Sequence, residues 1–275
     1  MADRYDLVIV GMGSGGLVSA EFAVSLGLKV AVVERARVGG DCLWTGGVPS
    51  KALLALAKDA SHDTDATDRQ TNFSRVKEGV QAAIDAIAPH DSVERFEGLG
   101  VRVLQTTARF FDSNALQAGD AVISSRRFVI ATGSRPALPD IPGLDPTKIF
   151  TNENIFALRD RPDHLVVLGG GPIGVEMAVA HRRLGIPVTI VQRSSIMPHD
   201  EPELVAAQAL RAAVVPPVRL LDVHDAGDRQ PALGVHAGHA AERRAGHRRA
   251  VVAVLAADDH AAPGLAEDVP VAPHH

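Results

Sequence analysis

The stretch DLVIVGMGSGG, Asp6–Gly16, decides the fold, and a second stretch, HLVVLGGGPIG at His164–Gly174, repeats its pattern. In each stretch an apolar run typical of a buried strand opens into a G-x-G-x-x-G turn and then a helix-like segment. A second apolar run follows, and it ends at Glu34 in the first copy and at Gln192 in the second, 23 residues after the first glycine in both. The sequence therefore predicts one βαβ unit used twice, within an α/β fold.

The first glycine turn has the residue types that a dinucleotide requires. Gly11 permits a tight turn, Gly13 lets the backbone approach a pyrophosphate, and Gly16 lets helix and strand pack closely. The helix that starts near Ser14 supplies free N–H groups and a partial positive charge. Glu34 can accept hydrogen bonds from ribose hydroxyls. These features predict a Rossmann-like, doubly wound nucleotide-binding unit.

The second turn predicts a second unit of the same kind. Four of its residues are candidate cofactor ligands: Gly169, Gly171, Ile173 and Gly174. Gln192 occupies the position that Glu34 has in the first copy. A glutamine does not repel a 2′-phosphate, and the neighbouring Arg193 can pair with one, so the sequence slightly favours NADPH over NADH. The alternative is that Arg193 is an ordinary surface residue.

The segment between the two copies changes from helix to short strands. Val76, Val80 and Ile84 recur at helical spacing, and four short apolar runs then predict an antiparallel meander at 101–104, 108–111, 121–124 and 127–131. Several prolines at 136–146 form a stiff connection. We therefore expect a first nucleotide-binding domain at 1–150 and a second, incomplete one at 151–211.

The tail at 212–275 differs from the rest of the chain. It holds seven of the 12 histidines and contains no Ile, Lys, Asn, Phe, Tyr, Trp, Met, Ser, Thr or Cys. A GC-rich gene read out of frame would give this composition, so we hypothesise a frameshift shortly after residue 204. A natural low-complexity tail is the alternative. A histidine-rich metal-binding tail is a third interpretation, although the spacing fits no metal-ligand motif.

Composition excludes several classes of function. The net charge of −5 gives no reason to expect nucleic acid or an anionic membrane as a partner, and the apolar runs are far shorter than a membrane span needs. The only cysteine of the chain, Cys42, can form no intrachain disulfide. We expect a cytoplasmic protein that acts on a small-molecule substrate and holds no metal.

The cysteine lies in the loop GGDCLWTGGVPSK, Gly39–Lys51, and this loop carries a family resemblance. The chain resembles the class I pyridine nucleotide–disulfide oxidoreductases. The sequence of this loop is most similar to the mercuric reductase-like and dihydrolipoamide dehydrogenase-like branches. Seven residues of the loop match the family pattern: Gly39, Gly40, Cys42, Gly46, Pro49, Ser50 and Lys51. The run FVIATGSRP, Phe128–Pro136, resembles the family's second FAD-contacting segment.

The resemblance implies FAD on the first glycine turn and NAD(P)H on the second. It implies further FAD contacts from six residues outside the glycine motif: Gly40, Asp41, Ala108, Ala131, Thr132 and Gly133. It also implies that Lys51 lies beside the flavin and pairs with Glu176. The implied activity is hydride transfer from NAD(P)H to FAD and then electron transfer to a disulfide, lipoamide or Hg(II).

The loop departs from the family pattern at one position. Cys42 matches the thiol that exchanges with the substrate, whereas Gly47 stands where the family has the cysteine nearer the flavin. Because thiol–disulfide exchange in this cycle needs both sulfurs, the standard dithiol reaction is blocked. Gly47 is compatible with an inactivating change, with a lone Cys42 that traps a mixed disulfide, and with flavin chemistry that needs one thiol or none.

Two late elements of the family have no counterpart in this sequence. They are the segment whose aspartate holds the flavin ribityl chain and the C-terminal interface domain that makes the family homodimeric. We therefore expect the dimerisation domain to be absent. The alternative function is a non-catalytic nucleotide-binding remnant of such an enzyme.

Overall fold

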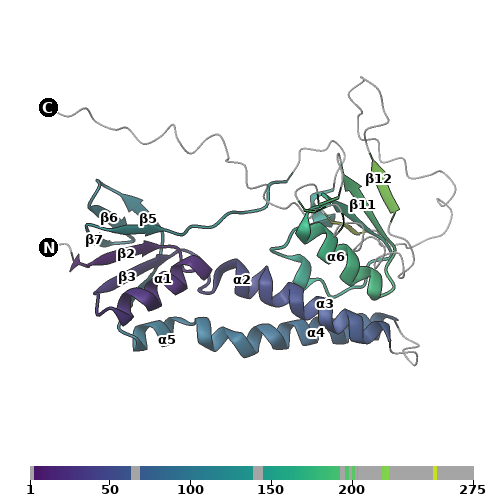
Figure 1. Cartoon of the computed structure of the whole chain (residues 1–275), viewed down its shortest axis with the longest axis horizontal. Helices are drawn as coiled ribbons and strands as arrows, with labels where there is room; N and C mark the ends of the chain where they lie inside the picture. Colours follow the sequence, from purple (N-terminus) through teal and green to yellow (C-terminus); the bar gives the residue numbers. More distant parts are fainter. Residues whose placement is uncertain are drawn as a thin grey trace, which may run out of the picture.

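The computed structural model of the chain describes residues 3–62, 69–138, 145–192, 196–197, 200–201, 203, 219–222 and 250–252 (Figure 1). Two parallel sheets and one antiparallel sheet organise these residues. No helix in these ranges is long and apolar enough to cross a membrane. The sheets and the helices between them form a mixed α/β fold, which confirms the predicted fold class.

The first parallel sheet has the order β4-β3-β2-β8. Its strands are β2 (Leu7–Val10), β3 (Val30–Glu34), β4 (Arg102–Gln105) and β8 (Phe128–Ile130). Helix α1 (Ser14–Ser25) connects β2 to β3. In chain order these strands run third, second, first and fourth, which is the strand order of a doubly wound mononucleotide unit.

The antiparallel sheet differs from the predicted meander. It contains β5 (Ala108–Phe110), β6 (Ala115–Ala118) and β7 (Ala121–Ser124), with the short β1 (Asp3–Arg4) parallel to β7. The prediction that 101–104 and 127–131 belong to it is wrong, because β4 and β8 pair in parallel with β3 and β2. The prediction also missed β6. A short apolar run reads alike in either kind of sheet, so the sequence alone did not assign the partners.

The second parallel sheet repeats the order of the first. Its strands run β12-β11-β10-β13-β9, all in parallel register. They are β9 (Ile149–Phe150), β10 (Leu165–Leu168), β11 (Val188–Gln192), β12 (Arg219–Asp222) and β13 (Ala250–Val252), and helix α6 (Pro172–Arg183) connects β10 to β11. If β10 is numbered first in the chain, the strands β12, β11, β10 and β13, which are neighbours in the sheet, are the third, second, first and fourth, as in the first sheet. Since β12 and β13 lie within 212–275, the sheet extends beyond residue 211, where the sequence pattern placed the end of this unit.

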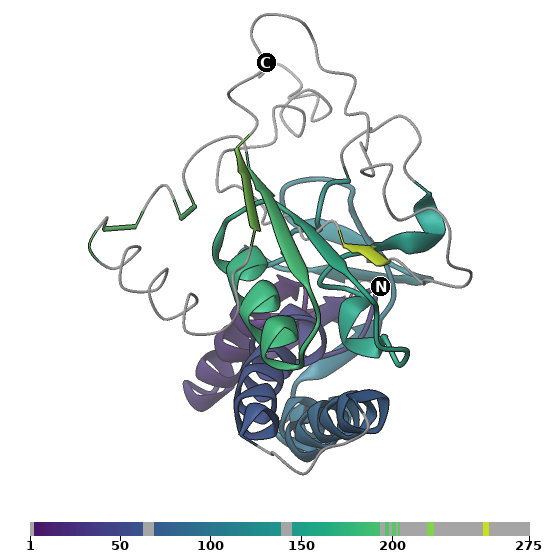
Figure 2. The ribbon, with the colours of Figure 1, turned by 90° about the vertical axis from the view of Figure 1, so that its right-hand side faces the viewer.

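Four helices follow the first βαβ unit. They are α2 (Gly40–Trp44), α3 (Gly47–Ser61), α4 (Arg69–Ile87) and α5 (Val93–Gly98), and short 3-10 turns lie at η1 (Ala88–Asp91), η2 (Pro146–Lys148) and η3 (Ile155–Ala157). Helices α3 and α4 lie side by side and extend from the first parallel sheet to the second (Figures 1 and 2). Their apolar side chains pack with α6 and the second sheet, whereas α1 and α5 cover the first.

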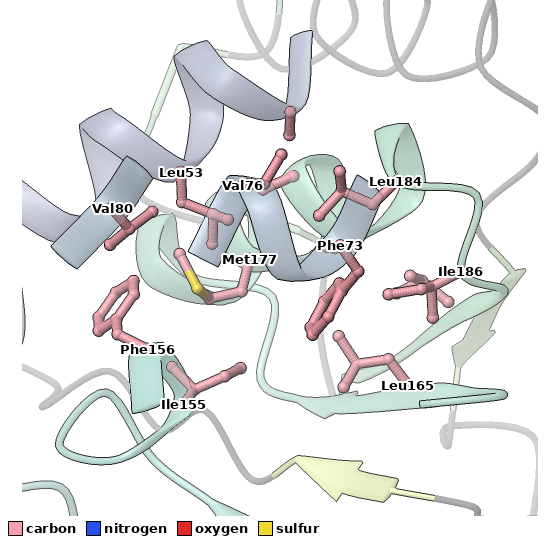
Figure 3. Packing of buried hydrophobic residues seen from close by; sticks show 14 of the residues in the cluster. Leu53, Phe73, Val76, Val80, Ile155, Phe156, Leu165, Met177, Leu184 and Ile186 are labelled. Carbon is pink, nitrogen blue, oxygen red and sulfur yellow. The ribbon is translucent and has the colours of Figure 1, made fainter. Parts of the chain in front are cut away.

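Three apolar clusters hold these layers together. The first parallel sheet buries one face against the antiparallel sheet, through residues such as Val8 and Ile123, and the other against α1 and α5. The largest cluster joins α3 and α4 to α6 and the second sheet (Figure 3). Phe73, Val76 and Val80 of α4 and Met177 of α6 are buried in it, so the predicted helical stripe faces this core.

Replacing Val251 with proline should test the position of β13. Because β13 lies between β10 and β9, a proline would remove a backbone donor from the sheet interior, and we expect a loss of about 1–3 kcal/mol in the free energy of unfolding. Chemical denaturation would measure it. Leu220→Pro in the edge strand β12 is the matched control and should cost less. Equal and negligible effects of both changes would contradict this strand order.

Candidate functional site

The first glycine turn brings two backbone segments into direct contact. Gly11 has φ 100°, and a Cβ atom there would lie 2.2 Å from the carbonyl oxygen of Ala131. A Cβ atom on Gly16 would lie 2.0 Å from the carbonyl oxygen of Gly11. Both distances are far below van der Waals contact, so only glycine permits this packing. The turn therefore seats α1 on the end of β2, beside the segment that follows β8.

The N-terminus of α1 lies open at this turn. Gly13 is its N-cap, no side chain caps it, and its first turn holds no acidic residue. The first N–H groups of a helix have no partner within the helix, and together with the helix dipole they attract anions. The exposed Ser14, Thr132 and Gly133 lie around the same end of the sheet. This arrangement fits a pyrophosphate, and a side chain at Gly13 would fill the space.

Glu34 fixes the glycine turn from the next strand. Its side chain is 8% exposed, its Oε2 accepts a hydrogen bond from the Met12 N–H at 2.6 Å, and its Oε1 accepts one from the Ala36 N–H at 2.7 Å. A carboxylate has about four lone-pair positions, so two remain for other donors. Glu34 can therefore accept hydrogen bonds from a further donor at this end of the sheet.

The second glycine turn has the same construction. Gly169 has φ 99°, and a Cβ atom on Gly174 would lie 2.2 Å from the carbonyl oxygen of Gly169. Gly171 is the N-cap of α6, again without a side-chain cap. Gln192 Oε1 accepts a hydrogen bond from the Gly170 N–H at 3.0 Å, just as Glu34 accepts one from Met12. Half-buried Ile173 lies in the first turn of α6, whereas Arg193 is outside the described residues.

The cysteine loop touches the first glycine turn. Gly39 and Gly40 have φ values of 100° and 56°, and a Cβ atom on Gly40 would lie 2.5 Å from the Cα atom of Gly13. The start of α2 is therefore held against the start of α1, backbone to backbone. As a result, the exposed Cys42 lies one helical turn or less from the proposed phosphate cradle.

Gly47 faces the Cys42 sulfur. A Cβ atom built on Gly47 would lie 3.0 Å from Cys42 Sγ. In a disulfide, the Cβ atom of one cysteine lies about 3 Å from the sulfur of the other, as the S–S length of about 2.05 Å and its bond angles require. The backbone at position 47 is therefore already placed for a disulfide with Cys42, and only the second sulfur is missing.

Trp44 anchors the loop from within. Its Nε1–H donates to the Val38 carbonyl oxygen at 2.6 Å, and the Arg37 guanidinium carbon lies 3.4 Å from the centre of its ring. Leu43 is fully buried beside it. These contacts hold the five-residue helix α2, which is too short to be stable alone. Sequence reasoning missed this stack.

Lys51 and Glu176 meet across the two units. Lys51 follows Gly47 by about one turn of α3, Glu176 lies on α6, and their side chains form an ion pair. The two side chains are 65% and 31% exposed, so solvent screening keeps the contribution to stability small. The pair brings together two residues 125 positions apart.

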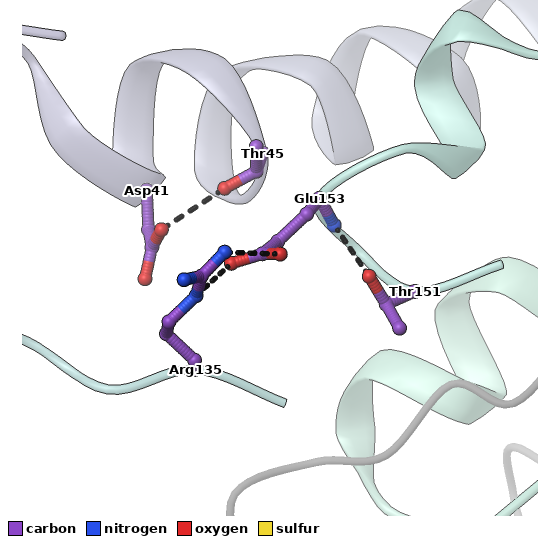
Figure 4. Close-up of polar contacts among 5 residues, drawn as sticks. All are labelled: Asp41, Thr45, Arg135, Thr151 and Glu153. Atoms are coloured by element: carbon purple, nitrogen blue, oxygen red, sulfur yellow. Dashed lines mark hydrogen bonds and ion pairs between the residues drawn. The ribbon is translucent and has the colours of Figure 1, made fainter. Parts of the chain in front are cut away.

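A polar cluster that sequence reasoning missed lies near the loop (Figure 4). Arg135 donates to both carboxylate oxygens of Glu153, at 2.9 and 3.1 Å, and this hydrogen bonding lowers the pKa of Glu153. On the facing helix the Thr45 hydroxyl donates to Asp41 at 3.0 Å. The Arg135–Glu153 pair fastens the segment after β8 to the start of the second unit. Within the described ranges no group of His, Cys, Asp or Glu side chains could hold a metal ion.

Comparison with known proteins assigns the family. The sequence profile of the pyridine nucleotide-disulphide oxidoreductases matches residues 5–214. The chain is 35% identical over 216 residues to a mercuric reductase of Streptomyces lividans, covering 74% of this chain and 45% of that protein. It is 32% identical over 227 residues to a dihydrolipoyl dehydrogenase of Bacillus subtilis, covering 74% and 47%.

A solved structure gives the same result. The HOCl-induced flavoprotein disulfide reductase RclA from Escherichia coli is similar with a TM-score of 0.68 and 26% identity, covering 79% of this chain and 48% of that one. The chain belongs to the pyridine nucleotide-disulphide oxidoreductase family, whose members depend on FAD and use NAD(P)H. It spans about half the length of these relatives.

Replacing Gly47 with cysteine should create a disulfide with Cys42 without moving the backbone. We expect the oxidised variant to have nearly no free thiol under denaturing conditions, whereas the reduced one has about two, as a thiol-specific reagent would show. Val48→Cys is the matched control, because Val48 packs against the core, and it should keep both thiols. Two free thiols in oxidised Gly47→Cys would contradict the geometry.

Proposed function

We propose that this chain binds FAD at the first glycine turn and NAD(P)H at the second, and that it delivers electrons to an acceptor at the Cys42 loop. The backbone contact between Gly13 and Gly40 carries this proposal, because it places the cradle for the cofactor phosphates directly beside the loop that holds the thiol. The acceptor classes are a disulfide, lipoamide or Hg(II), in keeping with the names of the relatives.

The residues at this end of the first sheet would each bind a different part of FAD. The N–H groups that follow Gly13 would hold the pyrophosphate, and Glu34 would accept hydrogen bonds from the ribose. Four further residues would contact the cofactor from the neighbouring loops: Asp41, Ala131, Thr132 and Gly133. Ala108, at the start of β5, would meet the adenine from the antiparallel sheet. When bound, FAD supplies a ring that takes up a hydride and releases two electrons.

The ion pair would serve the proposed site from α3 and α6. Lys51 would place its ammonium group at the reacting end of the cofactor and favour negative charge there, while Glu176 partly compensates the lysine. Cys42 would be the thiol that meets the acceptor. Since Gly47 offers no second sulfur, the chain would not store an electron pair as a dithiol.

A non-catalytic nucleotide-binding remnant is the second candidate. The observation that favours it is the same missing sulfur at Gly47, which leaves Cys42 as the only thiol of the chain. Both candidates bind FAD, and they differ in whether NAD(P)H bleaches the bound flavin.

Gly13→Ala should separate cofactor binding from folding. Its Cβ atom would lie 3.6 Å from the nearest protein atom, the Cα atom of Gly40, so the protein accommodates it. It would nevertheless fill the space that a pyrophosphate occupies, and we expect FAD affinity to fall by about tenfold or more. Flavin absorbance per protein after reconstitution would measure this, together with the unfolding midpoint without flavin.

Gly98→Ala is the control, because no atom lies within 4 Å of the added carbon. It should keep the affinity of the parent protein. Retention of full FAD affinity by Gly13→Ala, or no flavin uptake by the parent protein, would contradict the proposed site. Bleaching of the bound flavin by NADPH would favour the enzyme over the remnant.

Gln192→Glu should change the choice of nicotinamide cofactor. The change keeps an oxygen that can accept from the Gly170 N–H, but it places a carboxylate where a 2′-phosphate would bind. We expect NADPH affinity to fall by about tenfold or more relative to NADH. Titrations of both cofactors against the parent protein and the variant would measure the ratio. An unchanged ratio would contradict the placement of the ribose at Gln192.

A further inference from the structure

The apolar core between α4 and α6 contains two titratable side chains that the proposed reaction does not use. Lys77 of α4 and His181 of α6 are both fully buried. Both lie beside aromatic residues of the cluster in Figure 3: Lys77 beside Phe73 and Phe156, and His181 beside Phe73. Lysine is almost never fully buried without a compensating partner, so the position requires an explanation.

Lys77 has one hydrogen bond and two aromatic neighbours. Its Nζ donates to the Ile155 carbonyl oxygen of η3 at 2.8 Å, and it lies 5.4 Å and 6.0 Å from the ring centres of Phe73 and Phe156. No carboxylate is among the causes of its pKa shift: burial and the charge of Arg159 lower the pKa of Lys77 to about 7. At neutral pH, Lys77 is therefore in its uncharged amine form far more often than a lysine in water is.

The hydrogen bonds of His181 define its tautomer. Nδ1 lies 2.8 Å from the Met177 carbonyl oxygen, and a carbonyl only accepts, so Nδ1 carries the hydrogen. Nε2 then carries the lone pair of the neutral ring, and within the described residues it has no partner. Burial and the charge of Lys77 lower the pKa of His181 to about 3.

Protonation of His181 would therefore create a cation without an acceptor. The elements packed on α6 contribute apolar side chains to this cluster: Leu53 and Ala57 from α3, Leu165 from β10, Ile190 from β11, and Phe73 from α4, whose ring centre lies 6.4 Å from that of His181. The charge that acts on His181 is that of Lys77, which itself lies near the cationic Arg159. A charged imidazole would thus face like charge in a low-dielectric core.

We propose that Lys77, Phe73 and His181 form an acid-sensitive interlock, in which α6 stays packed on α4 while the imidazole is neutral and separates from it when the imidazole is protonated. Because α6 also carries Glu176, release would withdraw Glu176 from Lys51. That last consequence rests on the proposed function, whereas the interlock itself does not require a cofactor.

The two groups act in separate pH windows. His181 has a folded pKa below its ordinary value of 6.5, so its stabilisation is complete above about pH 6.5 and is lost as the pH falls towards 3. Lys77 has a folded pKa below its ordinary value of 10.5, so its contribution is complete above about pH 10.5 and is lost as the pH falls towards 7. Each group changes the unfolding constant by up to about tenfold per pH unit within its window.

Unfolding of the flavin-free full chain as a function of pH would test the proposal. His181→Phe keeps a ring in the core, and it should flatten the parent's loss of stability between about pH 6.5 and 4. Lys77→Met keeps the length of the side chain, and it should flatten the rise between about pH 7 and 10. Because it also removes the charge that lowers the pKa of His181, it should reduce the loss between pH 6.5 and 4 without abolishing it. His181→Phe should leave the rise between pH 7 and 10 in place, and exposed groups cancel when each variant is compared with the parent. Parallel curves for the parent and His181→Phe would overturn the proposal.

Amide hydrogen exchange of the parent protein would locate the opening without any variant. After correction for the intrinsic exchange rate, α6 should lose about tenfold or more of its protection between pH 7.5 and 5.5. Helix α1, which contacts neither group, should retain its protection. Equal loss in α1 and α6, or undiminished protection of α6, would overturn the interlock. If α6 loses protection as expected but the protein binds no flavin, the proposed function would be contradicted and the interlock would stand.

Discussion

The close approach of backbone to backbone at the glycine turns is the constraint on which the rest of the site depends. Gly11 meets Ala131, and Gly40 meets Gly13, at distances that leave no room for a side chain on Gly11 or Gly40. Three segments far apart in the sequence therefore share one end of the first sheet. Since parallel strands point their carboxyl ends the same way, this end is also where doubly wound folds bind ligands.

The same βαβ design appears twice, and the helices between the two copies contact the second one. Both sheets place their first four strands in the same order, and in both a residue at the end of the second strand accepts a hydrogen bond from the glycine turn. Lys51 of α3 pairs with Glu176 of α6, and Phe73 of α4 lies beside His181 of α6. These contacts join the helices between the two copies to the second unit.

Sequence pattern predicted the parts of the fold that depend on local chemistry. The two G-x-G-x-x-G turns, the acceptors Glu34 and Gln192 and the buried stripe of α4 follow from spacing alone. Strand partners did not follow from it, because β4, β8 and the tail strands β12 and β13 are defined by residues distant in the sequence. The Arg135–Glu153 pair and the burial of Lys77 were missed for the same reason. The Lys51–Glu176 pair was anticipated only through family resemblance.

The number of electrons that the flavin-loaded protein accepts tests the central claim most directly. If Cys42 acts alone, anaerobic titration should consume about one NADPH per flavin, because no disulfide is present to take a second electron pair. Oxidised Gly47→Cys, titrated in parallel, should consume about two. Consumption of about two NADPH per flavin by the parent protein would contradict the account given for Gly47. A long-wavelength thiolate–flavin absorbance band during its reduction would also contradict it.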